Sequence, residues 1–228
     1  MKWSELFTSS VGKKWIMGLT GIFLVLFLIV HVGLNACIFA MDGGVMFNKA
    51  AHFMGSNAVP RILEIGLFAG ILLHIVQGWS LELSNRAARK KGYAISMGNK
   101  GSKWYSRSMG LLGTLLFLFL VMHIAHFWVP SRITGLDPVM IEGKEFHNLY
   151  GEMLQIFQGN LLVVILYVLG CFALAWHLLH GFQSAFRTLG LTNKRYLILV
   201  EGAGALFSII VPLVFALMPI SMYMGWIK

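Results

Sequence analysis

Histidine is the residue type whose placement in this sequence points to chemistry. The chain carries eight histidines, and most of them lie inside long apolar stretches: His31, His74, His123, His126, His177 and His180. A lone imidazole inside a membrane span commonly hydrogen-bonds to a neighbouring helix. Ionisable side chains in such a setting are costly, however, and are functional candidates by default. Because four separate stretches each carry at least one histidine, we expect a shared role such as metal ligation.

The composition defines the environment of these histidines. Hydrophobic residues make up 57% and charged residues 12% of the 228 residues, which leaves too few charges to cover a water-soluble fold. The net charge of +9 could suit a nucleic-acid binder, but not on a chain this apolar. Cys37 and Cys171 lie in apolar runs outside any Cys-x-x-Cys-His motif, so we expect neither a disulfide nor covalently attached haem.

Five apolar stretches are long enough to cross a bilayer, which takes about 20 helical residues. The sequence therefore predicts one all-α membrane domain over residues 1–228, with spans at about 15–40, 62–83, 109–129, 161–186 and 196–227. Only helices satisfy this much backbone within lipid. Between the third and fourth spans, apolar residues recur at helical spacing from Phe146 to Phe157. This predicts an amphipathic helix on the outer interface.

The basic residues predict the orientation of the chain in the membrane. One side receives the larger share of the 18 Lys+Arg residues, namely Lys2, Lys13, Lys14, Arg86, Arg89, Lys90, Lys91, Lys100, Lys103, Arg107, Arg187, Lys194 and Arg195. Basic loops face the cytoplasm. We therefore expect a cytoplasmic amino terminus and an external carboxyl terminus.

The depth of each histidine can be counted from the nearest cytoplasmic basic residue, at 1.5 Å of rise per helical residue. His31 and His123 lie at about 24–25 Å on this scale. His74 and His177 lie at about 15–18 Å. The four histidines thus form two levels, with one pair nearer the outside and one pair nearer the cytoplasm.

Two further histidines fit the levels less well. His126 and His180 follow His123 and His177 by three residues, so each shares roughly one helix face with its neighbour. On the same depth scale they lie at about 28 Å and about 10 Å. Depth therefore favours His123 and His177, although His126 or His180 could replace its neighbour.

Glycines recur at matching positions beside the favoured histidines. Gly21 and Gly113 each precede an outer-level histidine by ten residues, while Gly78 and Gly181 each follow an inner-level histidine by four. A glycine removes side-chain bulk where a flat macrocycle must lie against a helix. The spans therefore look like two matched pairs.

Two facing pairs of histidines in a helical bundle are the ligand set of two bis-histidine b haems. Ligation by imidazole on both faces closes the iron to oxygen and suits electron transfer. Zinc fits less well, since neither level offers a carboxylate or thiolate at matching depth.

Taken in order along nearly the whole chain, these residues resemble a known family. The set comprises Thr20-Gly21 before His31, Phe47-Asn48-Lys49-Ala50-Ala51-His52-Phe53-Met54, Leu63-Glu64-Ile65, His74-x-x-x-Gly78, Gly113 before His123, and His177-x-x-x-Gly181 before Leu189-Gly190. It is similar to the five-span, dihaem cytochrome b subunit that anchors succinate:quinone oxidoreductases, which include succinate dehydrogenases and quinol:fumarate reductases.

The resemblance implies a role as a membrane anchor, with the dicarboxylate chemistry on partner subunits. It implies a flavoprotein subunit and an iron–sulfur subunit on the cytoplasmic face of a bacterial inner membrane, and electron exchange with a quinone, often menaquinone. His74 and His177 would hold the proximal haem, nearest the iron–sulfur subunit. His31 and His123 would hold the distal haem.

Two other residues are candidates for secondary roles. Glu64 lies near the outer end of the second span, three residues after Arg61. It predicts either an i,i+3 ion pair or a carboxylate that exchanges protons with a quinone near the distal haem. Arg187 follows the fourth span and is placed to bind a propionate of the inner haem.

Two other interpretations remain open from the sequence alone. Another dihaem cytochrome, such as the quinone-reactive subunit of a hydrogenase or formate dehydrogenase, would show similar ligation. A transporter could use the same histidines to relay protons. The sequence does not distinguish succinate oxidation from fumarate reduction.

Overall fold

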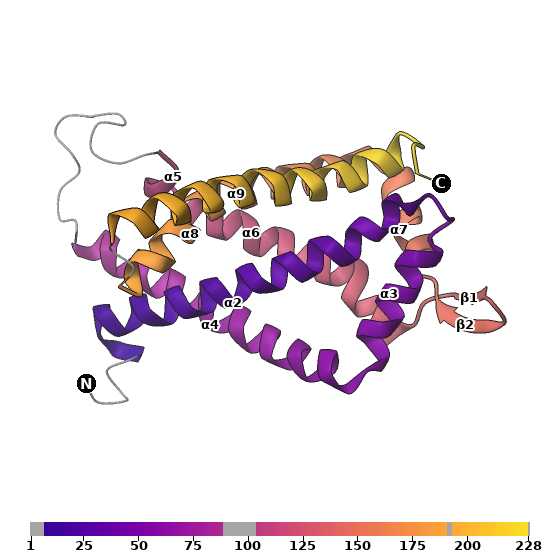
Figure 1. The fold of residues 1–228 in the computed structure, drawn as a ribbon, viewed down its shortest axis with the longest axis horizontal. Helices are drawn as coiled ribbons and strands as arrows, with labels where there is room; N and C mark the ends of the chain where they lie inside the picture. The colour runs from indigo at the N-terminus through magenta and orange to yellow at the C-terminus, as the bar shows by residue number, and fades with distance from the viewer. Residues whose placement is uncertain (1–6, 89–103, 191–192, 228) are drawn as a thin grey trace. The chain divides into compact units, whose positions relative to one another are not determined.

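The chain is an all-α, multi-pass membrane protein. The computed structural model describes residues 7–88, 104–190 and 193–227. Within these residues, five helices are long and apolar enough to cross a membrane (Figure 1). They are α2 (Ser10–Ala36) with a 3₁₀ extension η1 (Cys37–Ala40), α4 (Ala58–Ala88), α6 (Met109–His123) with the extensions η2 (Ile124–Trp128) and η3 (Pro130–Thr134), α8 (Leu161–Thr188), and α9 (Lys194–Tyr223).

The predicted number of spans is confirmed, and their boundaries shift by a few residues. α2 and α4 begin earlier than predicted, while α9 ends at Tyr223 rather than at residue 227. Helices continue beyond the apolar core because their ends can be solvated at the interface. Several basic residues used to predict the orientation lie outside the described residues: Lys2, Arg89, Lys90, Lys91, Lys100 and Lys103.

The third span changes helix type immediately after His123. Residues Ile124–Trp128 and Pro130–Thr134 form π-helix, in which the hydrogen bonds run over five residues. The Val129 amide donates to the Ile124 carbonyl, and the Gly135 amide donates to the Pro130 carbonyl. Pro130 has no N–H to donate in the α-helical register, so the wider turns occur on both sides of the proline.

Where the structure describes the segments between the spans, they contain three short helices and one hairpin, namely α3 (Val45–Ser56), α5 (Trp104–Arg107), α7 (Leu149–Gln158), β1 (Pro138–Ile141) and β2 (Lys144–His147). The antiparallel register pairs Ile141 with Lys144, which leaves Glu142 and Gly143 as a two-residue loop. Both loop residues have positive φ, at 52° and 77°. Two-residue hairpin loops with positive φ at both positions match the right-handed twist of the strands.

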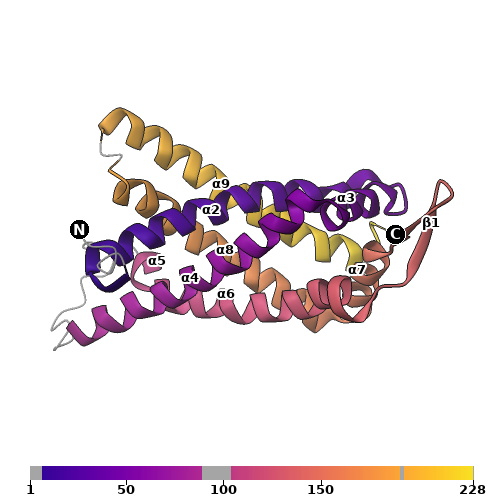
Figure 2. The same cartoon turned by 90° about the horizontal axis from the view of Figure 1, so that it is seen from below.

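The amphipathic helix is present, but it begins later than predicted. Phe146 lies in β2, and α7 starts at Leu149 because Asn148 caps it by accepting a hydrogen bond from the Gly151 amide at 2.9 Å. Tyr150, Met153 and Phe157 are buried. α7 packs against α3 and against the π-helical segment η2. Figure 2 shows α3, α7 and the hairpin at the same end of the ribbon.

Contacts divide the described chain into two compact units, each of which contains part of α2, α4, α6, α8 and α9. Unit 1 comprises Met1–Phe27, Leu67–Leu115 and Ala173–Ile209, and unit 2 comprises Leu28–Gly66, Leu116–Phe172 and Ile210–Lys228. His74 and His177 belong to unit 1, while His31 and His123 belong to unit 2. Each predicted histidine pair therefore lies within one unit.

Unit 2 contains a continuous apolar core. Its buried members come from η1, α3, α7, α8, α9 and the segment after α9, and are Ile38, Phe47, Tyr150, Met153, Phe157, Val164, Tyr167, Met218, Met222 and Ile227. A buried asparagine joins two of these elements: the Asn48 carbonyl oxygen accepts from the Tyr150 amide at 2.9 Å, and its amide nitrogen donates to Asn148 at 3.2 Å.

Helices in unit 1 approach one another closely at small residues. Gly18 lies against Ala185 and Thr188, and Gly70 lies against the ring of Phe23. Such close approach is typical of helix packing in membranes, where dispersion contacts replace the hydrophobic effect. Lys13 reaches the Ser80 hydroxyl at 2.8 Å, which adds a polar contact between α2 and α4.

Candidate functional site: two buried histidine pairs

The structure brings His74 on α4 and His177 on α8 together in unit 1. Their ring centroids lie 6.1 Å apart, with 66° between the ring planes. His74 Nδ1 lies 3.1 Å from the Thr20 hydroxyl oxygen on α2. His177 Nδ1 is buried and has no hydrogen-bond partner among the described residues. Two imidazoles with few polar neighbours therefore face each other between helices.

Thr20 determines which nitrogen of His74 is available to a ligand. The Thr20 hydroxyl donates its one proton to the Ile16 carbonyl at 2.7 Å, so it can only accept from His74. His74 Nδ1 then carries the ring proton, and the lone pair lies on Nε2. A metal-bound histidine typically donates its other ring N–H in this way, which fixes the tautomer and the ring orientation.

The second pair, His31 on α2 and His123 on α6, forms in unit 2. The ring centroids lie 5.8 Å apart, and the planes are almost perpendicular, at 84°. Aromatic rings surround this pair. Phe215 lies 5.5 Å from His31, and Phe119 stacks on His123 at 5.6 Å. His123 Nδ1 is buried without a hydrogen-bond partner among the described residues.

Both centroid separations fit ligation of one metal ion by each pair. An imidazole nitrogen lies about 2 Å from a metal that it binds, and the ring centre lies roughly 1 Å further on, so imidazoles on opposite faces of one metal have centroids about 6 Å apart. Within the described residues, no cluster of three or more His, Cys, Asp or Glu side chains could hold a metal. Two protein ligands suit a metal that brings its own equatorial ligands, as haem iron does.

The glycines beside the histidines also leave space. A Cβ atom on Gly113 or Gly181 would meet no described atom within 4 Å, and one on Gly21 would meet only His74 Cε1, at 3.8 Å. Gly21 thus lies against His74 rather than beside His31, its neighbour in the predicted pattern. The clearance at these three positions is compatible with a flat group beside the helices.

His126 does not join His31. Its Nδ1 lies 3.0 Å from the Tyr167 hydroxyl on α8, and the two rings stack at 5.8 Å with only 5° between their planes. The structure therefore places His123 beside His31 and directs His126 to Tyr167. The predicted role of His123 as an axial ligand stays a prediction, and this geometry favours it over His126.

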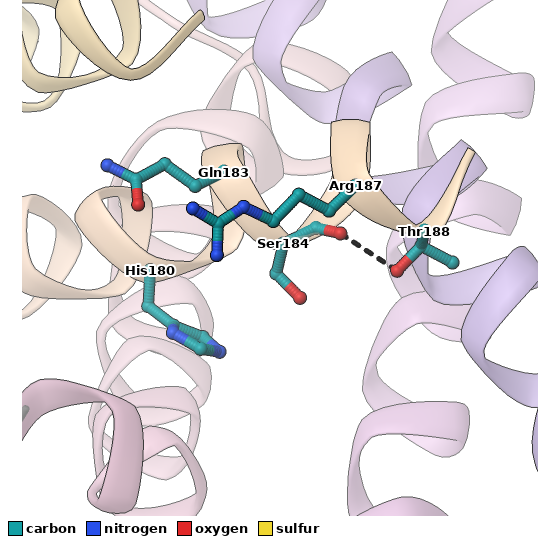
Figure 3. Close-up of a pocket in the computed structure, with 5 residues that line it drawn as sticks. All are labelled: His180, Gln183, Ser184, Arg187 and Thr188. Atoms are coloured by element: carbon teal, nitrogen blue, oxygen red, sulfur yellow. Dashed lines mark hydrogen bonds between the residues drawn. The ribbon is translucent and has the colours of Figure 1, made fainter. Parts of the chain in front are cut away.

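His180 and Arg187 line one pocket of about 300 Å³ in unit 1. Gln183, Ser184 and Thr188 complete its lining, all on the last two turns of α8 (Figure 3). The Arg187 guanidinium forms an ion pair with Glu201 on α9, and Figure 3 shows it extending back along the helix toward His180 and Gln183. Arg187 thus lies in a polar pocket, and one of its N–H groups already donates to Glu201.

Glu64 accepts hydrogen bonds from three side chains of unit 2. Arg61 donates at 3.0 Å, Trp128 Nε1 at 2.5 Å and Arg132 Nε at 3.2 Å. The predicted i,i+3 ion pair is confirmed. The other two donors come from the π-helical part of the third span, so Glu64 also ties the start of α4 to that segment. Its proton exchange with a quinone stays a prediction.

Outside the spans, Lys49 and Glu142 form an exposed ion pair of 2.7 Å. The hydrogen bond and charge of the Lys49 ammonium group lower the pKa of the Glu142 carboxyl below its usual value of 4.5. Burial raises the pKa of the Tyr150 hydroxyl, which lies in the core of unit 2. Neither group lies beside a histidine pair.

No role was predicted from the sequence for four residues that contact the candidate site residues: Thr20, Trp128, Arg132 and Tyr167. Thr20 is part of the pattern that carries the resemblance, and a polar side chain in an apolar stretch was a usable signal for a contact with another helix. The hydrogen bonds of Trp128, Arg132 and Tyr167 depend on tertiary contacts, which no local sequence pattern indicates.

Five spanning helices with buried imidazole pairs define the class of the protein: a multi-pass, all-α integral membrane protein with candidate metal-ligating histidines in its spans. No family model, curated protein or solved structure matches the chain. The two imidazole pairs are therefore the feature from which a function can be inferred.

Proposed function

We propose that this chain is the dihaem cytochrome b membrane anchor of a succinate:quinone oxidoreductase. The observation that carries the proposal is the presence of two adjacent imidazole pairs, with 5.8 and 6.1 Å between ring centroids and an edge-on arrangement of the rings, contributed by four different spans. When bound, the two b haems supply one-electron transfer between an iron–sulfur subunit and a quinone. Succinate or fumarate chemistry belongs to the flavoprotein partner.

In this proposal the four histidines would hold the two haems, two histidines to each. His74 and His177 would bind the proximal haem, and His31 and His123 the distal haem. Thr20 would present His74 with its Nε2 lone pair free. Ligation of each haem by two imidazoles would suit electron transfer rather than oxygen chemistry.

The pocket around Arg187 suits an anionic group of the proximal haem. A propionate needs cationic or hydrogen-bonding partners, and Arg187 shares its pocket with the polar side chains of Gln183 and Ser184. Because Arg187 also pairs with Glu201, propionate binding requires the guanidinium to serve two carboxylates. A guanidinium has five N–H donors, so it can do this.

The cytoplasmic amino terminus, the external carboxyl terminus and a bacterial inner membrane location are part of the same proposal. They rest on the distribution of basic residues. The flavoprotein and iron–sulfur subunits would dock on the basic face, and the quinone, for which we infer menaquinone, would diffuse in from the bilayer.

Purification of the tagged chain from its native membranes tests the proposal. We expect two low-spin b haems per chain by pyridine haemochrome assay, co-purified flavoprotein and iron–sulfur subunits by mass spectrometry, and reduction of the haems by succinate. Absence of low-spin haem would favour a proton-relaying transporter. Haem reduced by hydrogen or formate instead would assign the chain to another dihaem oxidoreductase.

The proposed role of Glu64 in proton exchange has its own test. If Glu64 exchanges protons with the quinone, Glu64→Gln lowers quinone-linked turnover by about 100-fold and leaves the haem content unchanged. Arg61→Gln is the matched control, since it breaks the same ion pair of 3.0 Å and keeps the carboxylate. Equal effects of both substitutions would show that the ion pair, and not proton exchange, is what Glu64 provides.

A further inference from the structure

His126 is a half-buried histidine with a defined partner and no place in the proposed ligand set. α6 ends at His123, and the π-helix begins with the next residue. A π turn contains more residues than an α turn, so His126 is displaced around the helix relative to its position on an α-helix. This displacement directs it to Tyr167 rather than to His31.

Tyr167 is the centre of the aromatic cluster around His123. Its side chain is only 5% exposed, and its ring lies 6.2 Å from that of His123, 5.2 Å from Phe119 and 4.9 Å from Phe157. Phe119 in turn stacks on His123 with 22° between the planes. The Tyr167 and Phe119 rings thus pack against the His123 imidazole; we call these two rings the aromatic wall.

A buried tyrosine hydroxyl needs a hydrogen-bond partner, and His126 supplies it at 3.0 Å. Because the planes of the two rings are also nearly parallel, at 5°, the bond fixes both the position and the tilt of the Tyr167 ring. His123 Nδ1 has no hydrogen-bond partner among the described residues, so packing must hold that ring in place.

We infer that His126 and Tyr167 are positioning residues for His123: their hydrogen bond holds the aromatic wall that sets the orientation of the His123 imidazole. This inference rests on the proposed function, since ring orientation matters most where the imidazole binds haem iron. The surroundings of an axial ligand tune the electronic properties of the haem. His126 thereby acts through Tyr167 and does not bind iron.

The test compares Tyr167→Phe, His126→Phe and the double variant in the intact membrane complex. Each removes the hydrogen bond; Tyr167→Phe keeps the ring itself, and His126→Phe puts a somewhat larger apolar ring in place of the imidazole. We expect two haems per chain in every variant, with a shifted midpoint potential and altered low-spin EPR g-values for the haem of His31 and His123 alone. His126→Asn restores a polar partner for Tyr167 and should recover part of the shift.

The double variant should shift the signal no further than the larger single variant, because both remove one bond. His180→Phe is the matched control: it follows His177 at the same three-residue spacing and should leave the haem of His31 and His123 unchanged. A purely structural role would lower the thermal stability without moving the EPR g-values or the potential.

Three results would overturn the inference. Unchanged signals in both single variants would refute positioning while leaving the two-haem proposal intact. Loss of a haem in His126→Phe with retention in His123→Phe would make His126 the ligand. Wild-type protein without haem would refute the proposed function, and the inference with it.

Discussion

The two histidine pairs have nearly equal centroid separations, but the residues around them differ in kind. In unit 1, a hydroxyl on the neighbouring helix holds His74 through a hydrogen bond. In unit 2, aromatic rings surround His31 and His123, and Asn35, on the same helix as His31, lies 3.5 Å from His31 Nδ1. His123 Nδ1 has no hydrogen-bond partner among the described residues, and the polar contact on its side lies one step away, between His126 and Tyr167. Similar distances between the ring centroids therefore occur with a hydrogen bond between helices at His74 and with mainly aromatic packing at His123.

The difference has a chemical consequence if both pairs bind haem. A hydrogen bond from Nδ1–H raises the basicity of the imidazole and favours the more positively charged ferric iron. Packing changes the ring orientation and the local dielectric without adding charge to the ligand. We therefore expect the two centres to respond to different kinds of substitution.

The largest effect should come from removing one histidine of a pair. His31→Ala and His123→Ala should each abolish the same haem, and His74→Ala and His177→Ala should each abolish the other, because a single imidazole leaves one axial position empty. Difference spectra and EPR of purified complexes measure which haem is lost. If His31→Ala and His74→Ala removed the same haem signal, the assignment of these histidines to two separate haem-binding pairs would be wrong.

Thr20→Val tests the hydrogen bond between Thr20 and His74 in unit 1. It keeps the shape of Thr20 and removes the acceptor for His74 Nδ1–H. Loss of such a bond typically weakens metal binding by 10- to 100-fold, and we also expect the potential of that haem to rise because the imidazole becomes less basic. Haem retention during competition with an apo-acceptor and a redox titration measure both effects.

Thr114→Val is the matched control for Thr20→Val. The Thr114 hydroxyl also donates to a carbonyl of its own helix, Gly110, at 2.8 Å, as Thr20 does to Ile16. It should leave both haems unchanged. Equal weakening by the two substitutions would mean that helix distortion, and not the bond to His74, explains the Thr20 result.

The sequence was enough to predict the spans and the histidine pairs, but not the contacts that surround each pair. Apolar stretches longer than a bilayer is thick determine the spans, and depth correctly paired His31 with His123 and His74 with His177 in space. The depth of His126 did not indicate that it turns toward Tyr167, because the three-residue spacing from His123 was interpreted as part of an α-helix. Pro130 was a visible signal for the π-helix, but its effect on His126 needed the hydrogen-bond pattern.

The start of α7 shows a second limit of local patterns. Apolar residues repeat at helical spacing from Phe146, yet β2 contains Phe146 and pairs it with Val139. The hairpin forms because Glu142 and Gly143 supply the turn, and Asn148 then caps the helix. Phe146 thus belongs to the helical sequence pattern, but its pairing with Val139 gives it a strand conformation.

Asn48 tests a feature specific to unit 2, the polar connection between α3 and α7. Asn48→Ala leaves the buried Tyr150 amide without its acceptor, which typically costs about 1–3 kcal/mol. We expect a lower melting temperature, measured by the unfolding of the detergent-solubilised complex, with both haems still bound. Asn57→Ala is the control, since the exposed Asn57 side chain donates to the Phe53 carbonyl of the preceding helix and accepts from no backbone amide among the described residues.

The smallest effect should come from the hairpin, where two weak contributions oppose each other. Glu142→Asn removes the exposed ion pair with Lys49, a kind of contact that contributes little. It also places at φ 52° a residue that tolerates the left-handed region better than glutamate does. We expect the turn to dominate, so the hairpin amides should exchange hydrogen more slowly in the variant, whereas Lys49→Gln alone should change exchange very little.

The pH dependence of this exchange separates the two contributions. Lys49 lowers the pKa of Glu142, so the ion pair stabilises the folded hairpin above the usual carboxyl pKa and is lost as the pH falls through the lowered value. The advantage of Glu142→Asn over the wild type should therefore grow in acid, where the wild type retains the strained turn without the ion pair. An advantage that shrank in acid would show that the ion pair does not stabilise the hairpin, and a variant less protected than the wild type at neutral pH would show that the ion pair contributes more than the turn geometry.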